Sequence, residues 1–486
     1  MKAGRWTTAL LGLLSLCGLA CGAERARPSI LLVVFDTLRA DAVSFYGDVH
    51  GTTPGIDALA RQGLVYTSAY APAPWTIPSH ATLFTGLRVD QHQTGMGRHT
   101  VLSEELDTLA ERLQRAGYET AAFSENSFIA DAFQMLQGFE TRRASRFDQL
   151  AALAVFDPSG EAPVAVKAIN PVTEIRTWIS SRTDERPFFI FVNLFDPHVP
   201  YEIRSDNPFV AGDATGEQIR QRSQRPEFML CGSAPTEEQM NVLRGLYLGD
   251  VAAADLKLRK ILALLRGAGL DRNLVTIVTS DHGELFGERR MMGHEFSLHS
   301  SLLRVPLVVH GLPGVEPAVV DTPVALLDVT PSILRWTGQV ADGALPGHPL
   351  PEAHGAEPPE RDLFAAYTDQ YLRLPDQLDF LTLHDREKKR RYCGPEDPVF
   401  GKMAALTRYP FKLLWFERYP AELYDLSWDP RERSNLAARK PEVATKLAAE
   451  VEARLETSAL FSEHEPAEEV SAEVRETLRA LGYLEE

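Results

Sequence analysis

The stretch Ile30-Leu31-Leu32-Val33-Val34-Phe35-Asp36 is an unbroken apolar run that ends at a carboxylate. Strands of a parallel sheet are buried on both faces, so they show continuous rather than alternating hydrophobicity. Similar runs follow at Phe188–Leu194, Leu274–Thr279 and Val305–His310, and a long amphipathic pattern from about Thr236 to Gly267 indicates a helix. This alternation predicts an α/β fold with a large mixed, mainly parallel sheet sandwiched by helices.

One helix is predicted from its capping residues and its apolar spacing. Ser103 can act as its N-cap and Gly117 can end it in a left-handed turn. Between them, apolar residues recur at helical spacing and would face the core, namely Leu106, Leu109, Ala110 and Leu113.

After about residue 350 the pattern changes to short strands separated by Tyr-Pro pairs. These strands are Met403–Thr407, Phe411–Phe416 and Glu422–Asp425, and a helix is predicted over Ala437–Leu455. We therefore expect a large α/β domain over 28–350 and a smaller antiparallel α+β subdomain over 351–456. An acidic tail over 457–486 would carry a last helix near Val474–Leu481.

The charge balance bears on the class of partner. The 486 residues include 50 Lys plus Arg against 67 Asp plus Glu, a formal net charge of −17. Such a surface argues against nucleic-acid binding and favours a few local basic groups wherever an anionic substrate binds. The basic run Lys388–Arg391 is interpreted as a solvated loop.

The N-terminal residues 1–23 have the pattern of a signal peptide. Lys2 and Arg5 precede an apolar segment, Ala9–Leu16, which is too short to span a bilayer, and small residues follow it. We expect a periplasmic, secreted or outer-membrane protein, with lipid attachment through Cys21 as an alternative to simple cleavage. Cys231 and Cys393 could pair in an oxidising compartment.

Three predicted strands end in carboxylates or histidines: Asp36, Asp196 with His198, and Asp281 with His282. Ligand sites in open α/β sheets form along this edge. Although a single strand-end Asp is more often a cap, two carboxylates and an imidazole suit a divalent cation held by Asp36, Asp281 and His282. One ion is expected, because a second set of Asp and two His is not evident. Ca²⁺ is favoured, and Mg²⁺, Mn²⁺ and Zn²⁺ stay open.

Thr76 is the candidate nucleophile. It follows the loop Ala71–Pro74 and stands where an apolar segment begins that is interpreted as a helix. A hydroxyl at a helix start meets free backbone N–H groups and the positive end of the dipole, which favour anionic esters.

In the same order along the chain, these motifs resemble those of the sulfatase family of the alkaline-phosphatase superfamily, and the resemblance covers nearly all of the sequence after the signal. The matching segments are Pro28–Asp41, Thr76–Gly86, Gly117–Thr120, Asp196–Tyr201, Asp281–Glu284, Gly293-His294, Leu303–Leu307 and Leu423–Leu426 with Asp429-Pro430 and Asn435-Leu436.

The departures from that family concern its chemistry. Typical sulfatases carry Cys-x-Pro-x-Arg, whose Cys is oxidised to formylglycine, whereas here Thr76 and His80 occupy those two places, so no formylglycine is expected. Thr37 replaces a second metal-binding Asp, and His294 stands about where many relatives have Lys. The family's Gly-Lys-x-His motif is not found near Asn126.

The missing aldehyde affects the expected substrate. Hydrated formylglycine can expel sulfate by collapsing to the aldehyde, but the single hydroxyl of Thr76 cannot. A phospho-Thr intermediate is cleaved at phosphorus, which a metal and basic side chains can assist. The resemblance therefore implies a sulfatase-family enzyme, while the nucleophile favours phosphate esters over sulfate esters.

The resulting hypothesis assigns a role to each candidate. Thr76 attacks, with its pKa lowered by coordination to the cation. His80, His198 and His294 neutralise equatorial oxygens or protonate the leaving group.

Three functional classes remain open at this point. The first is a hydrolase of sulfate or phosphate/phosphonate esters of glycans, lipids or small molecules. The second is a transferase that passes a phospho-substituent between lipid and glycan. The third is a non-catalytic binding protein with the same fold.

Overall fold

A computed structural model describes residues 27–96, 101–145, 168–205, 207–210, 235–294, 296–339, 345–355, 361–368, 401–458 and 460. The predicted signal segment, the three cysteines discussed above, the basic run and the last predicted helix lie outside these residues.

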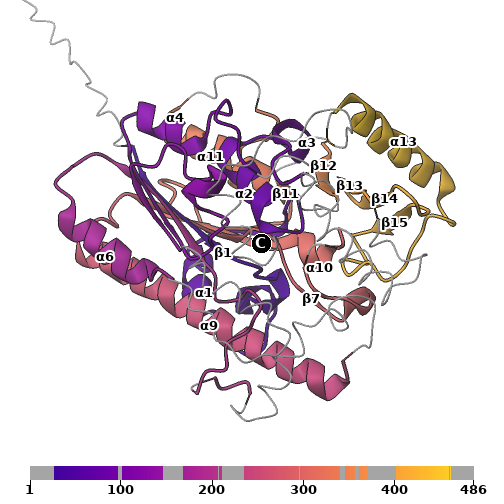
Figure 1. Ribbon diagram of the computed structural model, residues 1–486, viewed down its shortest axis with the longest axis horizontal. Coiled ribbons are helices and arrows are strands. Elements are labelled where there is room, and N and C mark those ends of the chain that lie inside the picture. Colours follow the sequence, from indigo (N-terminus) through magenta and orange to yellow (C-terminus); the bar gives the residue numbers. More distant parts are fainter. Residues whose placement is uncertain are drawn as a thin grey trace, which may run out of the picture.

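The fold is built on a nine-stranded sheet (Figure 1). In spatial order its strands are β10 (Ala318–Val320), β2 (Gly63–Tyr70), β9 (Arg304–His310), β6 (Leu274–Ser280), β1 (Ser29–Phe35), β5 (Phe188–Leu194), β3 (Glu119–Ser124) and β4 (Thr141–Ala144), with β11 (Val324–Ala325) also on β2. The central strand β1 pairs in parallel with β5 and β6, and Ile30 lies opposite both Phe189 and Val275. β9 runs antiparallel to β2 and β6. The predicted mixed, mainly parallel sheet is confirmed.

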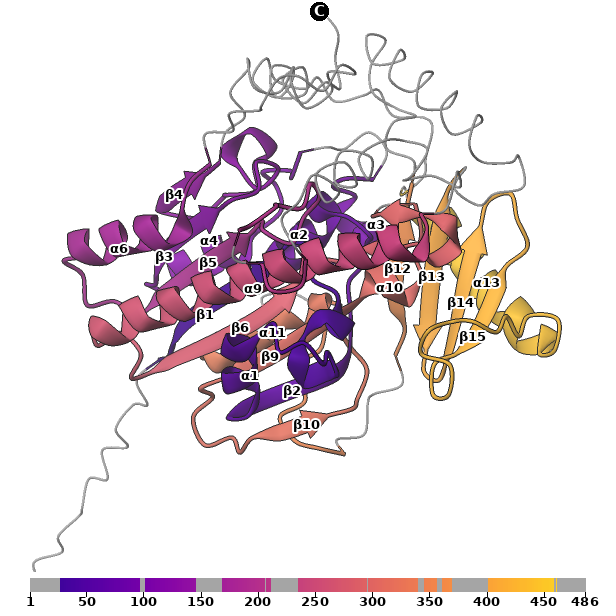
Figure 2. The same ribbon diagram turned by 90° about the horizontal axis from the view of Figure 1, so that it is seen from below.

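Helices cover both faces of this sheet, as the alternation along β1 requires. Ile30, Leu32 and Val34 belong to one apolar core, and Leu31, Val33 and Phe35 to the other. The first core includes residues of α2 (Thr76–Thr85), α4 (Leu109–Arg115) and α11 (Val329–Trp336). The second includes residues of α1 (Pro54–Ala60), α6 (Pro171–Ser181) and α9 (Glu237–Gly267). Figure 2 shows α9 lying along its face of the sheet.

The helix predicted to start at Ser103 begins later. Thr108 is the N-cap of α4, because its Oγ1 accepts from the Glu111 N–H at 3.2 Å while Glu111 Oε2 accepts from the Thr108 N–H at 2.7 Å. Ser103 instead accepts from the Glu105 N–H at 3.3 Å, within a turn. A complete capping box provides acceptors for two backbone N–H groups at the helix start, whereas Ser103 provides an acceptor for one. The Ser103 prediction was therefore wrong.

A four-stranded antiparallel sheet forms the C-terminal part of the fold. Its order is β12 (Leu363–Tyr367), β13 (Met403–Arg408), β14 (Phe411–Phe416) and β15 (Glu422–Asp425), and α13 (Pro441–Thr457) covers it. The predicted antiparallel part is confirmed, and β12 was not predicted. Its core is continuous with the first core of the large sheet. Within the described ranges, every helix is too short or too polar to span a lipid bilayer.

Candidate active site

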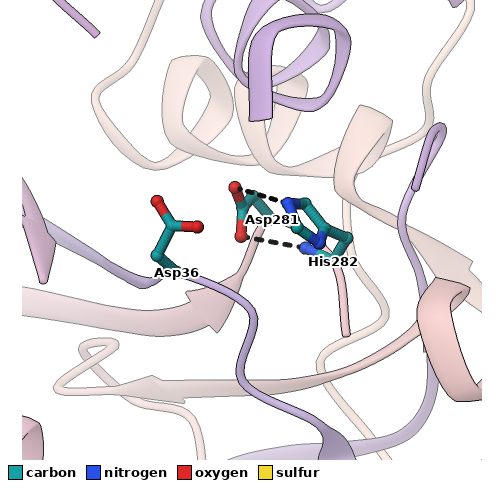
Figure 3. A group of neighbouring side chains, drawn as sticks. All are labelled: Asp36, Asp281 and His282. Carbon is teal, nitrogen blue, oxygen red and sulfur yellow. Dashed lines mark hydrogen bonds and ion pairs between the residues drawn. The ribbon is translucent and has the colours of Figure 1, made fainter. Parts of the chain in front are cut away.

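The carboxyl ends of β1 and β6 bring three side chains together. Asp36 directly follows β1, and Asp281 and His282 follow β6. All three are fully buried, and a ligand atom from each lies within 4.8 Å of the other two. Figure 3 shows the two carboxylates facing each other and the imidazole of His282 directed toward Asp281. Parallel neighbours in register explain why residues far apart in sequence meet here.

One atom of each of these side chains has no hydrogen-bond partner: Asp36 Oδ1, Asp281 Oδ2 and His282 Nε2. Their other atoms are engaged. Asp281 Oδ1 accepts from the Thr37 N–H at 3.1 Å and the His282 N–H at 3.0 Å, and His282 Nδ1 donates to Gly283 O at 3.0 Å. That bond leaves the Nε2 lone pair free for a ligand. Since buried polar atoms are rarely unpaired, this donor set fits a divalent cation.

Burial and charge perturb the ionisation of these groups in the metal-free arrangement. Burial, reinforced by the nearby Asp36, raises the pKa of Asp281 well above its usual range. Burial, reinforced by His294, lowers the pKa of His282 well below its usual range. A cation favours the ionised carboxylate and the neutral imidazole. It would therefore lower the pKa of Asp281 again, and it would bind His282 in the neutral form that burial already favours.

Thr37, which follows Asp36, takes the left-handed conformation with φ 56°. This is an uncommon state for a β-branched residue. Three hydrogen bonds hold it: its N–H donates to Asp281 Oδ1, its Oγ1 donates to Pro197 O at 2.9 Å, and Tyr247 Oη donates to its carbonyl at 2.9 Å. The Thr37 side chain thereby secures the loop after β5.

Thr76 is the first residue of α2, as expected from the sequence, and its side chain is buried. The Asn126 amide lies between the candidate nucleophile and Asp36, one of the three candidate metal ligands. Asn126 Nδ2 is 2.7 Å from Asp36 Oδ2 and 3.4 Å from Thr76 Oγ1. The Thr76 hydroxyl is therefore adjacent to the Asp36 carboxylate.

His80 lies one helical turn after Thr76 and is fully buried. Its Nδ1 donates to Thr76 O at 2.9 Å and lies 3.7 Å from Asp281 Oδ2. The edges of Phe84 and Phe191 surround its ring. Burial lowers the pKa of His80 to about 4, although Asp36 opposes the shift, so the ring is neutral near pH 7.

His198 and His294 complete the group. The ring centroid of His294 is 4.8 Å from that of His198 and 4.8 Å from that of His282. His198 Nδ1 hydrogen bonds to Val199 O, and His294 Nδ1 lies 3.3 Å from Glu284 Oε1. Burial and the neighbouring His294 lower the pKa of His198. The structure thus brings together the seven residues to which the sequence assigned a catalytic or metal-binding role, namely Asp36, Thr76, His80, His198, Asp281, His282 and His294.

Two asparagines of the site were not anticipated. Asn126 follows β3, and Asn193 on β5 donates to Asp36 Oδ2 at 3.2 Å. β3 ends at the same edge as β1 and β5, so its strand end was the available signal. Asp196, in contrast, pairs with Lys257 at 2.6 Å and Arg204 at 3.2 Å and does not belong to the group of candidate metal ligands.

Comparison with known proteins gives a consistent result. The family model described as Sulfatase matches residues 28–339. Arylsulfatase K of Danio rerio is 24% identical, over 87% of this chain and 82% of its own length. The multifunctional alkaline phosphatase superfamily protein PehA of Trinickia caryophylli is also 24% identical, over 85% and 91%. The crystal structure of the phosphonate monoester hydrolase of Agrobacterium radiobacter has a TM-score of 0.68 at 24% identity, covering 90% of this chain and 98% of that chain.

Proposed function

Because this chain belongs to the sulfatase family, we propose that it hydrolyses sulfate or phosphate/phosphonate esters by attack of Thr76 at a single divalent-metal site. The broader prediction, a hydrolase acting on ester bonds, is confirmed by the family and its relatives. The proposal adds the nucleophile, the number of metal ions and the preferred ester.

The observation that carries the proposal is the set of three buried atoms without hydrogen-bond partners on Asp36, Asp281 and His282. These residues would hold the cation, with Ca²⁺ favoured and Mn²⁺, Mg²⁺ or Zn²⁺ as alternatives. When bound, the cation supplies positive charge that stabilises oxyanions in the reaction.

Protein side chains perform the nucleophilic attack and the proton transfers. The first half-reaction forms a bond from Thr76 Oγ1 to sulfur or phosphorus and breaks the bond to the leaving oxygen. The proton of the Thr76 hydroxyl is, in net terms, transferred to the departing alcohol. His198 and His294, whose rings lie next to each other at the site, protonate that leaving group or hold equatorial oxygens. His80 positions Thr76 through its backbone carbonyl.

In the second half-reaction water attacks the same sulfur or phosphorus, the bond to Thr76 Oγ1 breaks, and one proton of the water returns to Thr76. The leaving group is then the alkoxide of Thr76, because threonine cannot expel the bound group by collapsing to an aldehyde as hydrated formylglycine does. This difficulty is smaller at phosphorus than at sulfur, so we expect phosphate or phosphonate esters to be preferred. The similarity to a phosphonate monoester hydrolase fold agrees with this expectation.

The setting of the enzyme follows from the N-terminal pattern. We propose export directed by residues 1–23 and an anionic ester of a small molecule, glycan or lipid as substrate. Lipid attachment at Cys21 would add a membrane anchor. Radiolabelled palmitate incorporation, with Cys21→Ser as the control, separates the anchored from the freely exported form.

A panel of four chromogenic substrates tests the function. Purified protein is stripped with chelator, reloaded with each metal in turn, and offered p-nitrophenyl sulfate, phosphate, a phosphate diester and a phosphonate. We expect turnover that depends on metal and is fastest on a phosphorus ester. Metal-independent turnover, or none on any of the four, would contradict the proposal and favour a transferase or a binding protein.

A further inference from the structure

We infer that Asn126 is a catalytic residue whose amide donates a hydrogen bond to Thr76 Oγ1 while that oxygen carries negative charge. The inference rests on the proposed role of Thr76 as nucleophile. It addresses the step that is hardest for this chain, the departure of an alkoxide from a threonine ester.

The orientation of the Asn126 amide is determined by its neighbours. Asn126 Oδ1 accepts from the Phe128 N–H at 2.9 Å, and Nδ2 faces Asp36 Oδ2 at 2.7 Å. Turning the amide over would place its oxygen against a carboxylate and its NH₂ against another donor. The NH₂ group therefore points into the site.

That NH₂ group has two hydrogens and two acceptors. One acceptor is Asp36 Oδ2, and the other is Thr76 Oγ1 at 3.4 Å. Hydrogen bonds at catalytic sites are often long without substrate and shorten when charge develops. A neutral amide has no proton to lose at working pH, so this contact can only donate.

The backbone around Asn126 is also held firmly. Its N–H is 3.1 Å from Ser124 Oγ and 3.2 Å from Asn193 Oδ1, and its carbonyl accepts from Ser124 Oγ at 2.7 Å. The side chain is buried, with 2% of its surface exposed. A donor fixed in advance stabilises developing charge without reorganisation.

The chemistry uses this donor in both half-reactions. When the Oγ1–P or Oγ1–S bond forms, the hydrogen bond stabilises the attacking oxygen as it loses its proton. When water displaces Thr76, the same N–H stabilises Oγ1 as the bond to it breaks, until a proton from the water reaches it.

The test compares Asn126→Ala with Asn193→Ala. Both variants remove one donor from Asp36 Oδ2, but only the first removes the donor to Thr76. Loss of an oxyanion donor typically lowers kcat by about 10²–10³-fold. We expect that loss in Asn126→Ala, a clearly smaller one in Asn193→Ala, and Mn²⁺ affinity by calorimetry that is similar in the two variants.

Orthovanadate provides a second readout, since its complexes imitate five-coordinate phosphorus bonded to the nucleophile. We expect Asn126→Ala to weaken vanadate binding more than Asn193→Ala does. Equal losses of kcat and vanadate affinity in the two variants would overturn the inference, as would wild-type kcat in Asn126→Ala. If Thr76→Ala stays active, the proposed function itself fails, whereas an inactive Thr76→Ala with a fully active Asn126→Ala refutes only the role of Asn126.

Discussion

Single residues of the site show why a cation would stabilise the folded chain. Asp36 and Asp281 place two carboxylates in one buried space, and each leaves one oxygen without a hydrogen-bond partner. Burial, reinforced by the nearby Asp36 carboxylate, raises the pKa of Asp281. A divalent cation removes this repulsion, so metal binding and stability should be linked.

We expect added Mn²⁺ or Ca²⁺ to raise the midpoint of thermal unfolding of chelated protein. A ligand at about 100 times its Kd contributes about 2.7 kcal/mol. In Asp281→Asn the effect should be lost, because one ligand charge is gone and the amide nitrogen cannot coordinate in its place. Scanning calorimetry with and without metal measures both. The exposed Asp321→Asn is the matched control, and a variant Asp281→Asn that still gains stability from metal would contradict the assignment.

The residues of the site were predictable to different degrees. Asp36, Asp281 and His282 are recognisable because each follows a predicted strand, and the carboxyl ends of parallel strands share one edge. Asn126 was overlooked, since an asparagine after a strand more often stabilises a turn. Only the three-dimensional structure shows that its amide reaches both Asp36 and Thr76.

Among the elements, α3 (Val89–His92) depends on an uncharged histidine. His92 Nδ1 accepts from the Thr94 N–H at 3.0 Å, so Nε2 carries the hydrogen that points to Thr82 Oγ1 at 2.9 Å on α2. Burial lowers the pKa of His92 from 6.5 to about 3. Protonation would destroy the acceptor and leave a charge in the core.

The sign of the pH effect follows from that shift. Below pH 6.5 His92 binds a proton in the unfolded chain, whereas in the folded chain it stays neutral until the pH approaches its lowered pKa of about 3. The stabilisation is thus complete above pH 6.5 and is lost as the pH falls, by roughly 2 kcal/mol at pH 5. Urea unfolding at several pH values measures it. His92→Gln should flatten the slope between pH 6.5 and 5, whereas the exposed His354→Gln should not, and equal slopes in all three proteins would contradict this account.

The long helix α9 joins two loops of the site. Its Lys257 Nζ lies 2.6 Å from Glu125 Oε1, next to Asn126, and 2.6 Å from Asp196 Oδ2, in the loop that carries His198. Lys257→Met leaves both carboxylates without this partner. We expect a loss of about 1–3 kcal/mol in unfolding free energy and lower kcat.

Lys260→Met on an exposed position of the same helix is the matched control, and its stability should stay within about 0.5 kcal/mol of wild type. Chemical unfolding and steady-state kinetics compare the two variants. Equal behaviour of Lys257→Met and Lys260→Met would show that the bridge does not hold the loops.

Secondary structure was predictable where a pattern was long. β5 and β14 have the expected bounds, because continuous or aromatic runs leave few alternatives. The antiparallel direction of β9 could not be read from its own sequence, since direction depends on the path of the connecting chain. The predicted start of α4 was wrong because Ser103 and Thr108 are both residue types that cap helices well. Only Thr108 is followed three residues later by a glutamate, Glu111, that completes a capping box.

At the scale of the whole molecule, a buried carboxylate that is paired with Lys412 also links the C-terminal part to the segment that follows His294. Glu432 Oε1 accepts from Lys412 Nζ at 2.6 Å, and Glu432 also accepts from the N–H and hydroxyl of Ser300 at 2.6 and 2.8 Å. Ser300 begins α10 (Ser300–Leu303), six residues after His294. The C-terminal sheet therefore supports the segment that leads from the site.

We expect Glu432→Ala to cost about 3–5 kcal/mol in unfolding free energy, because Lys412 is left buried without a counter-charge. The double variant Glu432→Ala with Lys412→Met removes that charge and should recover part of the loss. Urea unfolding of the two single variants and the double variant measures the coupling. Additive losses would show that the pair does not act as a unit.

The most direct test of the whole account is to identify the atom that becomes covalently modified. Metal-loaded enzyme is mixed with its best p-nitrophenyl ester, quenched in acid during the first turnover, digested and analysed by high-resolution mass spectrometry. We predict a phosphoryl, phosphonyl or sulfuryl group on Thr76, released on further incubation, and neither modification nor turnover in Thr76→Ala. A modification on another residue, or undiminished turnover by Thr76→Ala, would contradict the assignment of Thr76 as the nucleophile.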